Sequence, residues 1–164
     1  MYRHIIAAVD GSHNADKALR HAAGLAAHCG ARLTLVHIAN LHDLAEEEVG
    51  LLGTHALHER ARHHGLDILE RARQGLVKQG LPGGEGHVGE SWEGGKAMAR
   101  VLLDYGTSHG ADLIVLGTHG RGGLSHLLLG SFAENVLHQA RCPLLVVRES
   151  GEDAAQHLAR APTL

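Results

Sequence analysis

The sequence predicts a single α/β domain: a doubly wound, five-stranded parallel sheet with helices on both faces. Short apolar runs, which are typical of buried strands, alternate along the chain with longer segments whose apolar residues keep the helical period. The first strand, helix and strand fit within about 35 residues, as in a βαβ unit with parallel strands. A chain of 164 residues with 44% hydrophobic content suits one domain with its own core.

The first part of the chain is predicted to form a strand, a helix and a second strand. Residues 4–9 are an apolar run that ends at Asp10, so we expect a central strand followed by a turn. Ser12 or Asn14 can cap the helix that follows, and Gly30 suits its end. The apolar stripe of this helix comprises Ala15, Ala18, Leu19, Ala22, Ala26 and Cys29. Residues 33–38 are the second buried strand.

Residues 39–79 are predicted to contain a surface excursion and a long helix. An acidic triplet at 46–48 and a turn at 50–53 favour a surface segment over 39–54 that is mobile or partly helical. From about residue 55 to 79 the helical period is kept by Ala61, Ile68, Leu69, Ala72 and Leu76. Gly65 interrupts this helix at a cost of about 1 kcal/mol relative to alanine.

The second half of the chain contributes three more strands and two helices. We expect a short strand at 87–90, a helix at 93–108 and a strand at 112–116. A last helix begins at Ser131 and ends before Pro143, because the residue before a proline avoids the helical region. Residues 143–148 are the last strand and close a domain of residues 1–148. Residues 149–164 form a polar tail, either frayed or with a short helix.

Composition argues against several classes of protein. The net charge is −3 and no basic cluster stands out, so no nucleic-acid surface is expected. No apolar run approaches the roughly 18 residues of a membrane helix, and the chain starts directly with a strand, so we expect no membrane contact and no targeting segment. Cys29 and Cys142 lack metal or redox spacing, which favours a cytoplasmic protein. The sixteen histidines permit a response to pH, although solvated surface positions are the simpler explanation.

A glycine-rich stretch, residues 117–131, is the strongest functional signal. It follows the strand at 112–116 and leads into the last helix. Glycines let the backbone approach a ligand closely, and the N–H groups and dipole of a helix start favour an anion. The stretch therefore predicts a phosphate site. Gly117, Gly120 and Gly130 stand with two and nine residues between them, and Ser131 follows directly.

This spacing, Gly-x2-Gly-x9-Gly-Ser, resembles the nucleotide-binding loop of the universal stress protein family, in its ATP-binding branch. The resemblance extends to residues 5–12, 33–38 and 142–147, and covers about residues 2–148. It implies a Rossmann-like sheet with strand order 3-2-1-4-5, whose switch point lies between the first and fourth strands. Ligands of open α/β sheets bind at such a point, outside the carboxyl ends of the strands. Asp10 ends one of these strands and Gly117 ends the other.

The resemblance also implies roles for single residues in binding ATP with Mg²⁺. The adenine pocket would be lined by Ala8, Val9, Ile38 and Leu116, and the loop and helix start would contribute Gly117, Gly120, Gly130, Ser131 and Phe132. Asp10 would hold the divalent cation or accept a hydrogen bond from the ribose and adenine side. The alternative is that Asp10 only caps its turn. Arg121 reaches a phosphate or remains solvated. Ala133 stands where many ATP-binding relatives have a hydroxyl, which removes one possible phosphate contact.

Other patterns in the sequence have structural explanations. Ser131-x-x-Glu134 matches a capping box, so the hydroxyl can serve the helix itself, and Gly130 stands where a positive φ can be required. Residues 84–89 match a dinucleotide fingerprint but open no helix, and we reject them. Residues 89–96 miss a Walker A loop by one inserted glycine, lack the hydroxyl after Lys96 and follow no strong strand, so we reject them too.

The function expected from the resemblance is that of a dimeric, nucleotide-dependent regulator of the stress response. The dimer would form by antiparallel pairing of the edge strand, residues 143–148, with its copy. One alternative is a slow ATPase or phosphotransferase at the same pocket, although the motif holds no evident general base and no nucleophile other than Ser125 or Ser131. The other alternative is an interaction module without nucleotide, as in the family branch that lacks this loop.

Overall fold

A computed structural model of the chain describes residues 1–47, 53–118 and 129–148. They contain a five-stranded sheet in which neighbouring strands are parallel, in the order β3-β2-β1-β4-β5. The strands are β1 (His4–Ala8), β2 (Arg32–Asn40), β3 (Glu85–Ser91), β4 (Leu113–Gly117) and β5 (Leu144–Val147). The expected order, 3-2-1-4-5, is confirmed.

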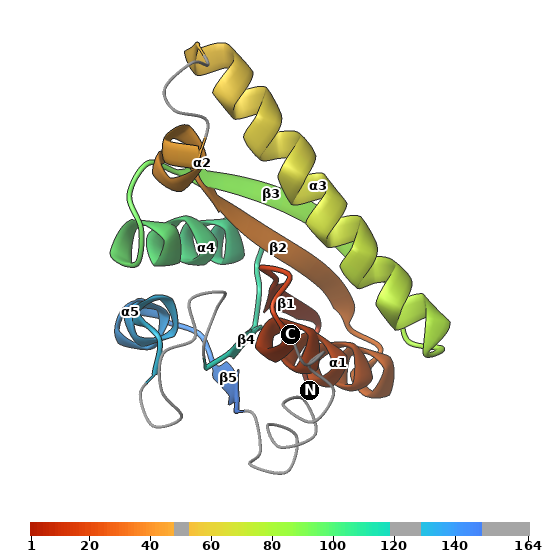
Figure 1. Ribbon diagram of the computed structural model, residues 1–164. Helices are drawn as coiled ribbons and strands as arrows, with labels where there is room; N and C mark the ends of the chain where they lie inside the picture. Colours follow the sequence, from red (N-terminus) through yellow and green to blue (C-terminus); the bar gives the residue numbers. More distant parts are fainter. Residues whose placement is uncertain (48–52, 119–128, 149–164) are drawn as a thin grey trace, which may run out of the picture.

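Helices cover both faces of the sheet, as predicted for a doubly wound fold (Figure 1). They are α1 (His13–Cys29), α2 (Leu41–Glu47), α3 (Thr54–Lys78), α4 (Lys96–Ser108) and α5 (Ser131–Gln139). α1 and α3 pack on one face, and α4 and α5 pack on the other. In the described part of the chain, no helix combines the length and the apolar character needed to cross a bilayer.

Successive strand residues point to opposite faces and feed two separate cores. In β1, Ile5 and Ala7 belong to the core under α1 and α3, whereas Ile6 belongs to the core under α4 and α5. β4 repeats the alternation with Val115 and Leu116. Aromatic residues make up only 2% of the chain, so aliphatic side chains fill both cores.

The ends of α1 match the caps expected from the sequence. Of the two candidates, Ser12 is the N-cap, and its Oγ accepts a hydrogen bond from the Ala15 N–H at 3.2 Å. Gly30 ends the helix with φ 65°, in the left-handed region that favours glycine.

Gly65 does not interrupt α3, which continues through it. A Cβ at this position would lie 2.7 Å from Val88 Cγ1 and 3.0 Å from His37 Cδ2. Glycine therefore lets the helix backbone approach β2 and β3 closely, and this packing offsets its poor helix propensity.

Several boundaries differ from those expected. α4 begins at Lys96 rather than at residue 93, because its N-cap Gly95 has φ 45°. β2 continues through Asn40, beyond the expected end at residue 38, and the segment expected as a surface excursion then forms the helix α2, which buries Leu41. The pattern at 84–89 falls largely on β3 and opens no helix, as expected, whereas the pattern at 89–96 begins inside β3 and ends at the first residue of α4. Residues 48–52 and the tail at 149–164 lie outside the described residues.

A buried histidine joins the amino-terminal ends of β1 and β2. Arg32 Nη2 lies 2.8 Å from His4 Nδ1, and His4 Nε2 lies 2.9 Å from Thr34 Oγ1. The His109 carbonyl oxygen also lies 3.0 Å from His4 Nδ1, so this nitrogen faces both a hydrogen-bond donor and an acceptor. Burial lowers the pKa of His4; the Arg32 guanidinium lowers it further, and the His109 carbonyl opposes both.

Candidate functional site

The switch point of the sheet lies between β1 and β4, which pair with Ile5 opposite Leu113 and Ala7 opposite Val115. After β1 the chain enters α1 on one face, and the helix that follows β4, α5, packs on the other. Connections that diverge in this way leave room for a ligand at the carboxyl edge of the sheet. Asp10 and Gly117 both lie at this edge, as expected.

A backbone hydrogen bond joins the two ends of the glycine-rich stretch. The Gly130 N–H donates to Thr118 O at 2.8 Å, and the Thr118 N–H donates to Val147 O at 3.0 Å. The start of α5 therefore lies beside the end of β4, which brings Gly130 and Ser131 near Gly117. Gly120, Arg121 and Ser125 lie outside the described residues.

Neither Gly130 nor Ser131 has the local structural role that the sequence allowed for it. Gly130 is the N-cap of α5, with φ −63° and ψ 150°, so the positive φ considered for it is wrong. The capping box is wrong too, because Ser131 is the first helical residue and no side chain caps the helix. The first intrahelical hydrogen bond runs from the Glu134 N–H to Gly130 O at 2.9 Å. The N–H groups of residues 131–133 have no partner among the described residues, and such groups bind anions.

Gly117 is required by packing between distant segments. A Cβ there would lie 2.9 Å from Asn14 O and 3.0 Å from the Asn14 carbonyl carbon. Glycine thus lets the first turn of α1 rest against the end of β4.

Asn14 brings an unexpected polar atom to the same place. Its Oδ1 is buried without a hydrogen-bond partner, which holds for no other side-chain nitrogen or oxygen of the described residues. The sequence indicates Asn14 only as an alternative cap for α1, a role that Ser12 fills. No sequence signal identifies this atom, because its environment depends on the contact with Gly117.

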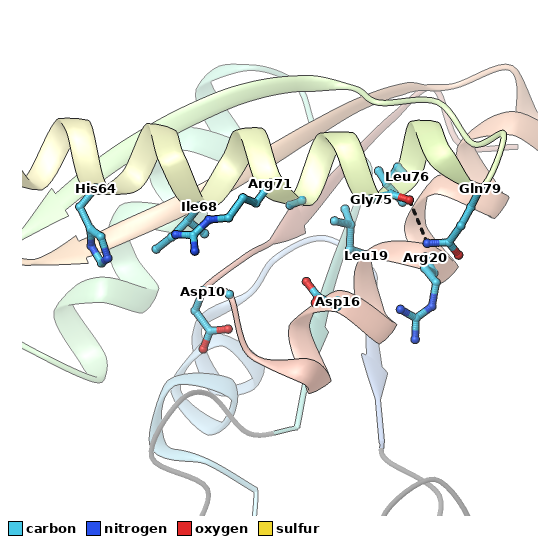
Figure 2. Close-up of a pocket in the computed structure, with 12 residues that line it drawn as sticks. Asp10, Asp16, Leu19, Arg20, His64, Ile68, Arg71, Gly75, Leu76 and Gln79 are labelled. Carbon is cyan, nitrogen blue, oxygen red and sulfur yellow. Dashed lines mark hydrogen bonds between the residues drawn. The ribbon is translucent and has the colours of Figure 1, made fainter. Parts of the chain in front are cut away.

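Asp10 shapes the turn between β1 and α1. Its Oδ1 accepts a hydrogen bond from the Ser12 N–H at 2.9 Å, and Gly11 between them has φ 79°. The turn-capping alternative therefore holds for one carboxylate oxygen. Oδ2 has no partner among the described residues, and the carboxylate points away from α3 (Figure 2). Within the described ranges, no three or more His, Cys, Asp or Glu side chains are grouped to hold a metal ion.

The residues expected to line an adenine pocket divide between the two faces of the sheet. Ala8, Ile38 and Leu116 contact the core under α4 and α5, as does Phe132, whereas Val9 belongs to the core under α1 and α3. Leu116 is only 1% exposed and Ile38 7%, while Ala8 is half-buried. Strand alternation could have separated Ala8 from Val9 in the sequence.

A cleft of about 410 Å³ between α1 and α3 includes Asp10 in its lining (Figure 2). Its charged and polar side chains also include Asp16 and Arg20 from α1 and His64, Arg71 and Gln79 from α3. Burial raises the pKa of Asp16, and the nearby Arg20 opposes this shift. Charges of both signs line the cleft, so it indicates no single class of ligand.

Comparison with known proteins agrees with the fold. Residues 1–148 match the model of the universal stress protein family. A putative universal stress protein from Staphylococcus epidermidis is 30% identical over 147 residues, which cover 90% of this chain and 84% of that protein. A universal stress protein from Methanocaldococcus jannaschii is 30% identical over 152 residues, which cover 91% and 84%.

Solved structures of similar proteins share this architecture. One, from the universal stress protein family in Burkholderia pseudomallei, is 32% identical with a TM-score of 0.65, and the match covers 89% of this chain and 96% of that one. A universal stress protein in complex with cAMP has a TM-score of 0.63 at 21% identity, covering 91% and 98%. One from Archaeoglobus fulgidus in complex with dAMP has a TM-score of 0.61 at 22% identity, covering 89% and 97%. From the match over residues 1–148 and the relatives at 30% identity, this chain belongs to the universal stress protein family.

Proposed function

We propose that this chain binds ATP with Mg²⁺ at the switch point between β1 and β4, and acts as a nucleotide-dependent regulator of the stress response in the cytoplasm. The observation that carries the proposal is the start of α5. Gly130 caps it without a side chain, and the N–H groups of residues 131–133 have no partner among the described residues. A helix start of this kind favours a phosphate through its N–H groups and its dipole.

The phosphates would lie in front of α5. Gly130 adds no side chain there, and the exposed Ser131 hydroxyl, which does not cap the helix, can donate to a phosphate oxygen. Gly117, Gly120 and Arg121 complete the phosphate side of the site in this proposal. The base would lie toward Ala8, Val9, Ile38 and Leu116, with Phe132 beside it.

Mg²⁺ fits Asp10. In nucleotide sites this ion binds one or two carboxylates and completes its shell with phosphate oxygens and water. Asp10 offers Oδ2, which no described residue uses, at the edge where the phosphates would lie. Bound Mg²⁺ would neutralise part of the triphosphate charge.

Two proteins of the same fold support an adenine nucleotide as the ligand. The cAMP and dAMP of these complexes share an adenine base and a phosphate with ATP. A site with a phosphate-binding helix start and an apolar end can hold both groups.

A slow ATPase or phosphotransferase is the alternative at the same site. Hydrolysis would require a side chain that activates water as a general base. Asp10 is a carboxylate at this edge, and one of its oxygens is already bonded to the Ser12 N–H. We therefore expect binding to dominate over turnover.

The protein is further proposed to be a homodimer, with residues 1–148 as the nucleotide-binding domain and residues 149–164 as a tail. β5 lies at one edge of the described sheet, where it pairs with β4. Its first three side chains are half-buried, and an apolar edge strand pairs readily with another strand. Antiparallel pairing of residues 143–148 with the same residues of a second copy would create a two-fold dimer.

Isothermal titration of nucleotide-free protein tests the ligand. ATP with Mg²⁺ should bind with a Kd on the order of micromolar, and EDTA should weaken the binding. GTP, which has the same triphosphate, controls for recognition of the base. Protein that takes up no ATP at about 100 μM would contradict the proposal.

A further inference from the structure

Asn14 carries a buried polar atom that the proposed site does not yet use. Its amide oxygen, Oδ1, is buried and has no hydrogen-bond partner among the residues that the structure describes. Buried polar side-chain atoms are nearly always hydrogen-bonded, and an unpaired acceptor costs free energy that an apolar side chain would not. Contacts among the described residues therefore do not account for the amide oxygen at this position.

Packing places Asn14 at the switch point. It is the second residue of α1, directly after the turn formed by Asp10 and Ser12. Its Cβ lies 3.2 Å from the position that a Cβ on Gly117 would occupy. The side chain of Asn14 thus begins against the end of β4, at the edge of the sheet where the nucleotide is proposed to bind.

We infer that Asn14 is a positioning residue for the nucleotide, and that its amide oxygen accepts a hydrogen bond from an O–H group of the bound magnesium–nucleotide complex. The inference rests on the proposed function. An amide oxygen only accepts hydrogen bonds, so it selects a donor rather than a phosphate oxygen. The O–H donors of such a complex are the ribose hydroxyls and the water bound to Mg²⁺. Because χ2 of asparagine rotates over a broad range, Oδ1 can meet the donor while the contact with Gly117 holds its Cβ.

Titration of wild type and Asn14→Ala with ATP, 2′-deoxyATP and 3′-deoxyATP, each with Mg²⁺ and with EDTA, tests this role. Asn14→Ala should bind ATP about tenfold more weakly, because one hydrogen bond to an otherwise unpaired acceptor is lost. If a ribose hydroxyl is the donor, wild type discriminates against one deoxy analogue and Asn14→Ala does not. If water on Mg²⁺ is the donor, both analogues bind like ATP and the variant loses part of its dependence on Mg²⁺.

Thermal unfolding without nucleotide separates this role from a structural one. Removal of an unpaired acceptor should leave the Tm unchanged or raise it by about 2–4 °C. Asn40→Ala is the matched control, since Asn40 Oδ1 accepts a hydrogen bond from the His42 N–H at 3.1 Å and its removal should lower the Tm.

The outcomes distinguish this inference from the proposed function. Wild-type protein that binds no ATP overturns both. If wild type binds ATP, then equal affinity, equal discrimination and equal Mg²⁺ dependence in Asn14→Ala overturn the role of Asn14 alone. A Tm that falls in Asn14→Ala while its nucleotide binding is unchanged would assign the amide to folding and overturn the inference as well.

Discussion

Gly130→Val tests the phosphate site with little damage to the fold. Gly130 has φ −63° and ψ 150°, a region that valine also adopts, so the substitution introduces no left-handed strain. The remaining cost is that of changing an N-cap from glycine to a β-branched residue, about 0.5–1.5 kcal/mol. The new side chain stands at the start of α5, next to the N–H groups of residues 131–133, for which the described ranges hold no partner.

The expected loss of ATP affinity is larger than this loss of stability. A hydrogen bond to a charged group contributes about 1.5–3 kcal/mol, so a phosphate kept away from two of these N–H groups loses about 3–6 kcal/mol. At 1.4 kcal/mol for each tenfold change, ATP affinity should fall by at least about 100-fold.

Gly53→Val is the matched control. Gly53 is the N-cap of α3 with φ −63° and ψ 156°, and a Cβ there would have no atom within 4 Å. Thermal unfolding should show similar losses of stability in the two variants, whereas isothermal titration should show loss of ATP binding in Gly130→Val alone. Wild-type affinity in folded Gly130→Val would refute the assignment of the start of α5 to the phosphates.

Turnover, assembly, pH dependence and helix packing can each be tested as well. Phosphate release should not exceed about one turnover per minute, and multiple turnovers faster than about 1 per second would establish an enzyme instead. Val146→Lys should shift the dimer toward monomer in sedimentation, and wild type that sediments as a monomer at about 50 μM would contradict the dimer. Because the pKa of folded His4 lies below its ordinary 6.5, the unfolded state binds more protons between the two values, and stability should be lost as the pH falls below 6.5. His4→Gln should flatten this dependence of the Tm on pH, and equal slopes would contradict the assignment to His4. Gly65→Ala should lower stability by about 1–3 kcal/mol, because its Cβ would meet Val88 Cγ1 at 2.7 Å, whereas Gly75→Ala in the same helix has open space and should raise it by about 0.5–1 kcal/mol, both measured by denaturant unfolding.

Features that act within a few residues could be predicted from the sequence. Ser12 accepts a hydrogen bond from a backbone N–H of the first turn, and Gly30 adopts the left-handed conformation that ends the helix. Both roles at the ends of α1 follow from residue type and position. The alternation of strands and helices is equally local, and it predicted the doubly wound fold. The strand order came from the family resemblance rather than from the residues alone, and the structure confirms it.

Features that depend on contacts between distant segments could not be predicted. From the sequence, Gly65 was expected only to weaken α3, whereas in the structure it allows α3 to pack closely on β2 and β3. Gly117 was expected to face a ligand, yet it also makes room for Asn14, whose unpaired oxygen no local pattern reveals. At the start of α5, a shift of one residue separates the capping box that the sequence allowed from the glycine cap that the structure has.

The hydrogen bond between the Gly130 N–H and Thr118 O means that the segment between these two residues can change in length or sequence without a change in the sheet. The folded framework holds Thr118 and Gly130, at the two ends of this stretch, next to each other. The entropy of closing a loop grows slowly with its length, and a doubling costs only about 0.6 kcal/mol. A lineage built on this framework can therefore lengthen or replace the segment between these two residues, and change what it binds, while the sheet and its two cores stay as they are.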